Sequence, residues 1–136
     1  KTTPAAEAVI LIVEDNLNNF ILMTRLLAFL GVKKCERKAS GWKVLEYAGT
    51  LGRIDLILMD IALPDADGYQ SLAALRSDER FSDVPIIAVT ADASVDSLNR
   101  ARESGFNGFI GKPLDPDRFP NQIRRALQGE EVWELA

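Results

Sequence analysis

"VILIVEDNLNNF", residues 9–20, decides the fold class, because five apolar residues run directly into two adjacent acids. An uninterrupted apolar run of this kind is typical of a strand buried on both faces, as in a parallel sheet. Glu14 and Asp15 follow it, and neighbouring carboxylates repel each other unless water or a cation compensates their charge. Asn16 is suited to cap the helix that follows, so the two acids need a separate explanation.

The same alternation of apolar runs and amphipathic segments continues along the chain. Expected strands cover residues 9–13, 32–39, 54–60, 84–90 and 105–113, the second of them a polar edge strand. Expected helices cover residues 17–30, 42–52, 67–76, a segment opened by Ser94, and 115–128. Five strands alternating with five helices predict an α/β fold, in which helices cover both faces of a parallel sheet.

Several local signals set the helix ends and faces. We expect caps at Ser40, at Asp67 with Gln70 as a capping box, and at Asp115 followed by Pro116. In the fourth helix the expected buried stripe is Val95, Leu98 and Ala101. In the first helix it is Leu17, Phe20, Ile21, Thr24, Leu27 and Ala28. That choice leaves an apolar patch at Leu22, Met23 and Leu26, which we interpret as a partner-docking surface.

Composition excludes several classes of function. The chain has 136 residues, 47% of them hydrophobic, which fits one globular domain. It has no histidine, so His-based metal sites and Ser-His-Asp triads are excluded. A net charge of −4 argues against direct binding of nucleic acid, and no apolar run is long enough for a membrane span. The single cysteine and the lack of a signal peptide favour a cytoplasmic location.

We expect a flexible segment at residues 1–8, the domain itself at 9–128, and a tail at 129–136. In that tail Trp133 is interpreted as an anchor that lies back on the domain.

Polar side chains end the expected strands. Glu14 with Asp15, then Asp60, Thr90 and Lys112 would meet at one edge of a parallel sheet. Each has a simpler explanation as a helix cap, a strand former or a solvated charge. All of them together indicate phosphoryl transfer with Mg²⁺, which needs hard oxygen ligands and a cation beside the phosphoryl group.

Four motifs carry a family resemblance: "LIVEDN", "DLILMDIALPDADG", "PIIAVTA" and "GFIGKP", in this order. With them the chain resembles the receiver domain of two-component response regulators, similar to single-domain members of the chemotaxis and cell-cycle type in bacteria. The resemblance implies a doubly wound (βα)5 fold of the flavodoxin or CheY-like kind, with five parallel strands in the order 2-1-3-4-5.

The resemblance also implies roles for particular residues. Asp60 resembles the phosphoacceptor, Lys112 the phosphate-binding lysine, and Thr90 and Phe109 the switch residues. Glu14, Asp15, Asp60 and the backbone carbonyl of Ala62 resemble the ligands of Mg²⁺. Ala62 and Asp92 depart from what the path of the attacking water needs, because alanine cannot orient water and Asp92 adds negative charge. These departures affect the expected lifetime of the acyl phosphate.

The implied donor is a phosphohistidine on a histidine kinase or a histidine phosphotransfer protein, and the implied output is contact with a downstream protein. A homodimer through the fourth helix, fifth strand and fifth helix is a further expectation, and membrane contact is not expected. The domain would catalyse its own phosphorylation and dephosphorylation without a separate turnover reaction.

Three alternative functions compete with this prediction. A phosphatase of the haloacid-dehalogenase type would need an acid where Ala62 stands, and a flavodoxin-like carrier would not place "EDNLNN" beside a phosphate. The third alternative is a degenerate receiver that acts as a phosphorylation-independent scaffold.

Overall fold

The computed structural model describes residues 2–63 and 68–135. Its core is a parallel sheet with the strand order β2-β1-β3-β4-β5-β6. The strands are β1 (Val9–Val13), β2 (Lys34–Lys38), β3 (Leu56–Met59), β4 (Ile86–Thr90), β5 (Gly108–Gly111) and β6 (Val132–Glu134). The helices are α1 (Leu17–Leu30), α2 (Val44–Leu51), α3 (Gly68–Arg76), α4 (Val95–Ser104) and α5 (Phe119–Leu127), with a 3-10 turn at Ala5–Glu7. The predicted doubly wound α/β fold is confirmed, with one strand more than expected.

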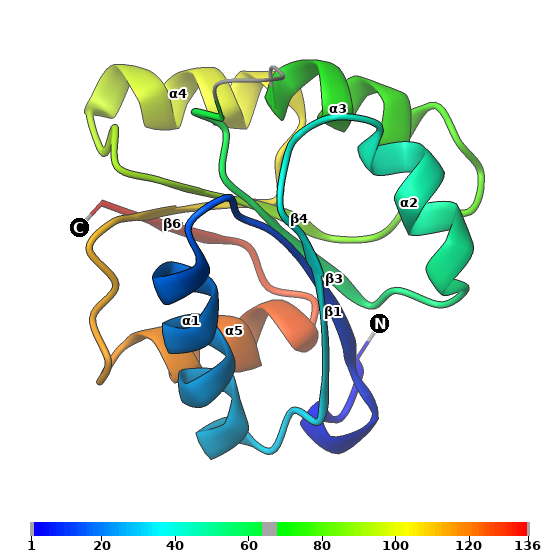
Figure 1. Ribbon diagram of the computed structural model, residues 1–136. Coiled ribbons are helices and arrows are strands. Elements are labelled where there is room, and N and C mark those ends of the chain that lie inside the picture. Colours follow the sequence, from blue (N-terminus) through cyan, green and yellow to red (C-terminus); the bar gives the residue numbers. More distant parts are fainter. Residues whose placement is uncertain (1, 64–67, 136) are drawn as a thin grey trace.

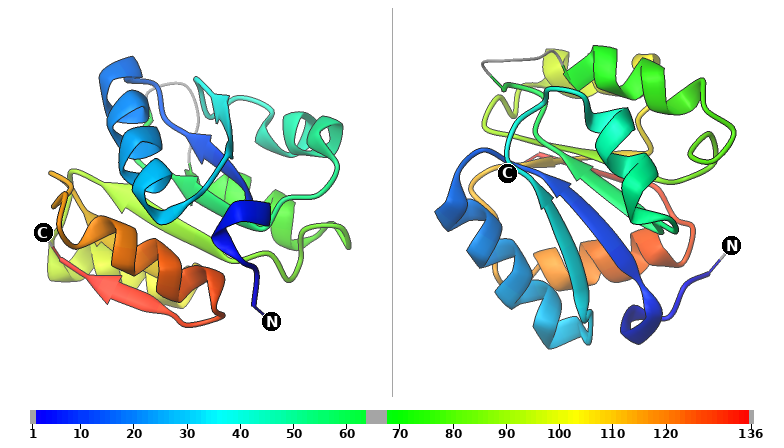
Figure 2. Two further views of the ribbon diagram at one scale, coloured as in Figure 1. Left: turned by 90° about the horizontal axis from the view of Figure 1, so that it is seen from below. Right: turned by 45° about the vertical axis from the view of Figure 1, so that its right-hand side comes forward.

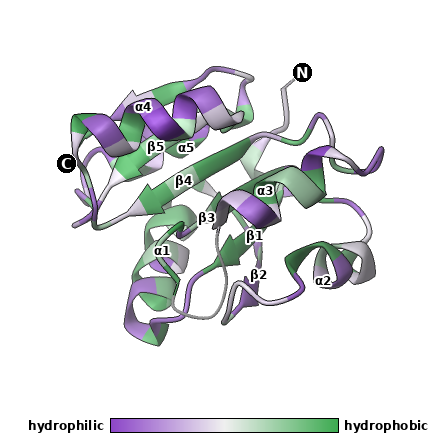
Figure 3. Ribbon diagram, turned by 90° about the horizontal axis from the view of Figure 1, so that it is seen from above, coloured by the Kyte–Doolittle hydropathy of each residue, from purple (hydrophilic) through white to green (hydrophobic). Residues whose placement is uncertain are grey.

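Helices cover both faces of the sheet (Figure 1). Side chains alternate along each strand, so Ile10 and Ile12 of β1 enter the core beneath α1 and α5, whereas Leu11 and Val13 enter the core beneath α2, α3 and α4. The inner strands β1, β3 and β4 are accordingly hydrophobic along their length (Figure 3). Burial on both faces therefore explains why these strands have uninterrupted apolar sequences.

Helix α1 has the predicted bounds but not the predicted orientation. Asn16 caps it by accepting a hydrogen bond from the Asn19 N–H (2.9 Å), and Gly31 ends it with a φ of 102°. Met23, Leu26 and Leu27 are the buried residues of the helix, whereas Leu17 and Ile21, both expected in the core, are exposed.

The docking patch predicted on α1 must therefore be corrected, because Met23 and Leu26 belong to the core. Of the three predicted residues only Leu22 is exposed. Leu17, Ile21 and Phe29 are exposed with it.

Two other helix starts differ from prediction, and a third cannot be compared. Ser40 does not cap α2, which begins at Val44, and the Ser40 hydroxyl instead accepts from the Trp42 N–H. Helix α5 begins at Phe119 because Pro120 lacks an N–H and is tolerated only in a first turn, so Asp115 does not cap it. The cap of α3 predicted at Asp67 lies outside the described residues.

In α4 the predicted Ser94 cap is confirmed, but Val95 is exposed. The buried side of this helix begins one turn later, with half-buried Leu98 and buried Ala101.

The C-terminal segment forms a sixth strand that the sequence did not predict. β6 pairs in parallel with β5, with Gly108 opposite Val132 and Phe109 opposite Trp133. A Cβ at position 108 would lie 2.5 Å from the carbonyl oxygen of Val132, so glycine permits this close approach. In Figure 2 (left), β6 in red lies along the edge of the sheet beside α5. Half-buried Trp133 packs against the core beneath α2, α3 and α4.

The start of the described chain also contacts the domain. The Thr3 N–H donates to the carbonyl of Leu127 (2.8 Å), and a 3-10 turn at Ala5–Glu7 leads into β1. Across residues 2–63 and 68–135, no helix has the length and apolar character that crossing a bilayer requires.

Candidate functional site

Three carboxylates meet at the carboxyl ends of β1 and β3. Oxygen atoms of Glu14, Asp15 and Asp60 lie within 4.8 Å of one another. Glu14 and Asp60 are buried, whereas Asp15 is exposed. The carboxylates lie close together because β1 and β3 are adjacent and parallel. The Asp60 N–H extends the hydrogen bonding between these strands by donating to the carbonyl of Val13 (3.0 Å).

Lys112 joins two of these acids. Its Nζ lies 2.7 Å from Oε1 of Glu14 and 3.0 Å from Oδ2 of Asp60. Burial lowers the pKa of Lys112, but its hydrogen bonds to Glu14 and Asp60 and their charges outweigh burial, so the pKa lies above its ordinary value of 10.5. The ammonium is therefore charged at neutral pH. Three carboxylates against one ammonium leave an excess of negative charge, which favours a cation.

The second carboxylate oxygen of Asp60 and that of Glu14 are each oriented by a backbone amide. Oδ1 of Asp60 accepts from the Ala62 N–H (2.9 Å), and Oε2 of Glu14 accepts from the Asn16 N–H (3.1 Å). The loop that carries Ala62 thus begins directly against Asp60. Asp60 has both oxygens engaged, one with Lys112 and one with Ala62, which fixes the orientation of its carboxylate.

Thr90 and Phe109, the predicted switch residues, are both fully buried. Thr90 ends β4, and its hydroxyl accepts from the Asp92 N–H (3.2 Å); within the described residues no hydrogen bond joins it to the carboxylates. Phe109 lies on β5 in the core beneath α2, α3 and α4, beside Trp133 of β6. The structure therefore brings Glu14, Asp15, Asp60 and Lys112 into one cluster. Thr90 lies next to it, because its carbonyl accepts from the Lys112 N–H (2.8 Å), whereas Phe109 lies in the core.

Arg37 is a neighbour of this cluster that the sequence did not indicate. It lies on β2, and its guanidinium donates to the backbone carbonyls of Glu14 (3.2 Å) and Asp15 (3.0 Å). On an edge strand, "KCERK" is also the sequence expected of a solvated surface, so no local signal distinguished this arginine from its neighbours.

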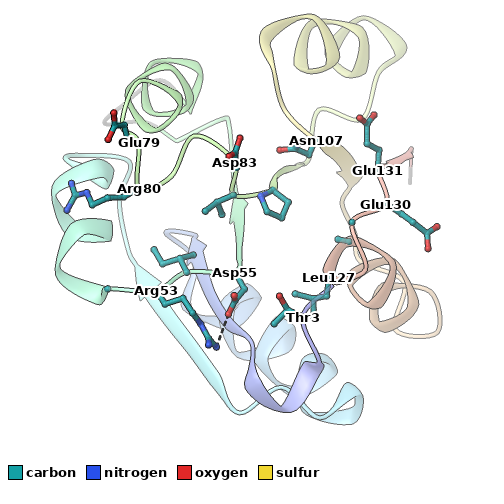
Figure 4. Close-up of a pocket in the computed structure, with 16 residues that line it drawn as sticks. Thr3, Arg53, Asp55, Glu79, Arg80, Asp83, Asn107, Leu127, Glu130 and Glu131 are labelled. Carbon is teal, nitrogen blue, oxygen red and sulfur yellow. Dashed lines mark ion pairs between the residues drawn. The ribbon is translucent and has the colours of Figure 1, made fainter. Parts of the chain in front are cut away.

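A cavity lies at the amino ends of β3, β4 and β5, lined by residues that directly precede these strands (Figure 4). Its volume is about 510 Å³, and its lining includes Arg53, Asp55, Asp83 and Glu130. Arg53 is already paired with Asp55 (3.1 Å), and the side chain of Glu130 points outward in the close-up. Arg53 and Asp55 thus occupy each other and are not free to fix a ligand in this cavity.

Comparisons with known proteins agree with this geometry. The family model described as response regulator receiver domain matches residues 10–124. The polar-differentiation response regulator DivK of Brucella ovis is 37% identical over 118 residues, which cover 87% of this chain and 94% of DivK. The chemotaxis response regulator CheY4 of Vibrio cholerae superposes with a TM-score of 0.79 at 25% identity, covering 88% of this chain and 98% of CheY4.

A signal receiver domain from Clostridium thermocellum shares the fold, with a TM-score of 0.79 at 23% identity over 89% of this chain and 98% of its own. Fold, motif order and sequence similarity agree. The chain belongs to the response regulator receiver domain family of two-component signalling systems.

Proposed function

We propose that Asp60 accepts a phosphoryl group from a phosphohistidine on a histidine kinase or a histidine phosphotransfer protein. The observation that carries this proposal is the cluster of three carboxylates with Lys112 at one sheet edge. A carboxylate oxygen of Asp60 attacks phosphorus, the phosphorus–nitrogen bond breaks, and its electron pair returns to the imidazole of the donor. The product is an acyl phosphate, which needs no histidine in this chain.

The donor set fits Mg²⁺, because it consists of oxygens, carries excess negative charge and is open to water at Asp15. Glu14, Asp15, Asp60 and the backbone carbonyl of Ala62 would hold the ion. When bound, it would neutralise charge on the phosphoryl oxygens.

The chain's own residues supply the other contributions. Lys112 provides a positive charge beside the attacking carboxylate, and the Ala62 N–H holds the second oxygen of that carboxylate. Thr90, at the end of the neighbouring strand, supplies a hydroxyl for a phosphoryl oxygen once its loop moves towards the site. Phosphoryl transfer depends mostly on such positioning and charge neutralisation.

The signal would then pass through Thr90 and Phe109 to the surface formed by α4, β5 and α5, as a population shift between two conformations. β6 covers the outer edge of β5. Any homodimer through this surface would therefore have to include β6 in its contact.

Exposed apolar side chains on α1 support docking of the helical bundle that carries the phosphohistidine. Leu17 is 54% exposed and begins the helix two residues after Asp15, so this face starts at the phosphoacceptor site. Ile21, four residues after Leu17 and 36% exposed, continues this face, and Leu22, 38% exposed, lies beside Ile21 on the helix.

Leu22→Glu should therefore slow phosphotransfer from the cognate donor about tenfold or more while leaving phosphorylation by acetyl phosphate unchanged. Phe29→Glu is the matched control, because Phe29 is exposed on the same helix but lies about 10.5 Å beyond Leu22, further from the phosphoacceptor site. Equal loss of both reactions in Leu22→Glu would contradict docking at this position.

The proposed function is tested by measuring intact mass after incubation with acetyl phosphate and Mg²⁺. We expect a gain of one phosphoryl group in the wild type, with none in Asp60→Asn and little when EDTA replaces Mg²⁺. A wild-type chain that gains no phosphoryl group under any of these conditions would instead favour a phosphorylation-independent scaffold.

A further inference from the structure

Arg37 connects three parts of the fold next to the acids. It pairs in register with Ile12, so its side chain lies on the α1 side of the sheet. From there its Nε donates to the carbonyl of Glu14 (3.2 Å) and its Nη2 to the carbonyl of Asp15 (3.0 Å). The guanidinium carbon lies 5.5 Å from the ring centroid of Phe20 on α1, a cation–π distance.

These contacts hold two consecutive peptide groups with one rigid group. A guanidinium is planar, and its donors form a fork of fixed geometry, so the two carbonyls cannot turn independently. The direction of each Cα–Cβ bond follows from the peptide groups on either side of it. Arg37 therefore restrains where the side chains of Glu14 and Asp15 point.

The restraint matters most for Asp15. The Glu14 carboxylate is held independently, by Lys112 and by the Asn16 N–H. In the described parts of the chain, no hydrogen bond holds the carboxylate of exposed Asp15. Its backbone, fixed by Arg37, is then what keeps this carboxylate near Asp60.

We infer that Arg37 is a positioning residue for the metal site, acting through the backbone of the acid pair. This inference rests on the proposed function, because the pair must bind a divalent cation for its position to matter. Replacing Arg37 removes a charge and a restraint, and these two losses change Mg²⁺ affinity in opposite directions. Loss of a nearby positive charge would strengthen binding of Mg²⁺, whereas loss of the restraint would weaken it.

The test is a calorimetric titration with Mg²⁺ and no phosphodonor. We expect Arg37→Met to weaken Mg²⁺ binding about tenfold, the low end of the range for outer-shell partners. The Mg²⁺ affinity of Arg37→Lys should lie between those of the wild type and Arg37→Met. An ammonium is a point donor and cannot hold both carbonyls as the guanidinium fork does. Lys34→Met is the matched control, because it removes the same charge from an exposed position on the same strand.

Far-UV circular dichroism in EDTA checks whether each variant is folded. If Arg37→Met is unfolded, the Mg²⁺ affinity of Arg37→Lys alone tests the inference. Binding by the Arg37 variants that equals or exceeds that of the wild type would overturn the inference while leaving the proposed function intact. A wild-type chain that does not bind Mg²⁺ would instead overturn the metal site itself, and with it the role of Arg37.

Discussion

Replacing Lys112 with methionine removes the cation that contacts both Glu14 and Asp60 and keeps most of the side-chain volume. At an effective dielectric constant of about 20, charges 2.7 and 3.0 Å apart attract by about 6 and about 5.5 kcal/mol. Desolvation of the ammonium, whose side chain is 14% exposed, offsets much of this attraction. Removing one partner of a buried pair typically costs about 3–5 kcal/mol, because the other charge stays buried. We expect about 3 kcal/mol here, because Asp15 keeps one side of the cluster open to water.

Urea unfolding measures this cost. With an m-value of about 1.5–2 kcal/mol/M, a loss of about 3 kcal/mol lowers the unfolding midpoint by about 1.5–2 M in EDTA. Mg²⁺ should recover more stability in Lys112→Met than in the wild type, because three carboxylates without an ammonium attract the ion more strongly. Lys33→Met, at an exposed lysine, is the matched control and should change the midpoint little.

The pH dependence has a definite sign. Because the pKa of Lys112 is raised in the folded state, its contribution to stability is complete below 10.5 and is lost as pH rises through the higher folded pKa. The wild type should lose stability in that alkaline window, and Lys112→Met should lack this component. An unfolding midpoint of Lys112→Met that matches Lys33→Met in EDTA, or equal stabilisation of both variants by Mg²⁺, would refute the reasoning.

Three further predictions concern other parts of the chain. Burial raises the pKa of Glu134, but hydrogen bonds from Gln122 and Arg118 and the charge of Arg125 outweigh burial, so the pKa lies below its ordinary value of 4.5. Glu134→Gln should therefore lower stability above pH 4.5. The difference in urea midpoint between this variant and the wild type should shrink as the pH falls through the lowered pKa of Glu134. Burial, and then the charge of Glu36, raises the pKa of Cys35 from 9.0 to about 11, so iodoacetamide should alkylate the folded chain at pH 8 about a hundredfold more slowly than the urea-unfolded chain. Gly108→Ala should cost about 1–3 kcal/mol by displacing β6, detected as a red shift in the emission of Trp133 in a Trp42→Phe background, and an unchanged spectrum would contradict the close approach of β5 and β6.

The strand ends were predictable because burial on both faces leaves a clear mark in sequence. β1 and β3 are apolar at every position until the sheet edge, where Glu14 and Asp60 stand. The carboxyl ends of neighbouring parallel strands lie side by side, so the residues that follow them come together. The carboxylate cluster could therefore be predicted from the sequence. Its contact with Lys112 followed in the same way, from the end of β5.

The orientation of α1 was not predictable from its residues. The helix has apolar residues around most of its circumference, so the 3.6-residue period does not select one face. Contacts with the sheet and with α5 decide the phase, and they bury Met23 and Leu26 while leaving Leu17 exposed. Choosing Met23 and Leu26 as surface residues was wrong for this reason.

β6 and Arg37 depend on contacts between residues far apart in the sequence. A three-residue strand has no periodicity to detect, and β6 exists because β5 offers an edge with Gly108 opposite Val132. Arg37 reaches the carbonyls of residues more than twenty positions earlier, and only the pairing of β1 with β2 brings them together.

The central claim is that Asp60 is the residue that receives the phosphoryl group. Borohydride reduces an aspartyl phosphate to homoserine, so peptide mapping after reduction of the phosphorylated chain locates the modified residue directly. Homoserine at position 60, absent without Mg²⁺, is the predicted result. Homoserine at Asp15, 5-hydroxynorvaline at Glu14, or no reduced residue in a chain that has gained a phosphoryl group would contradict the account.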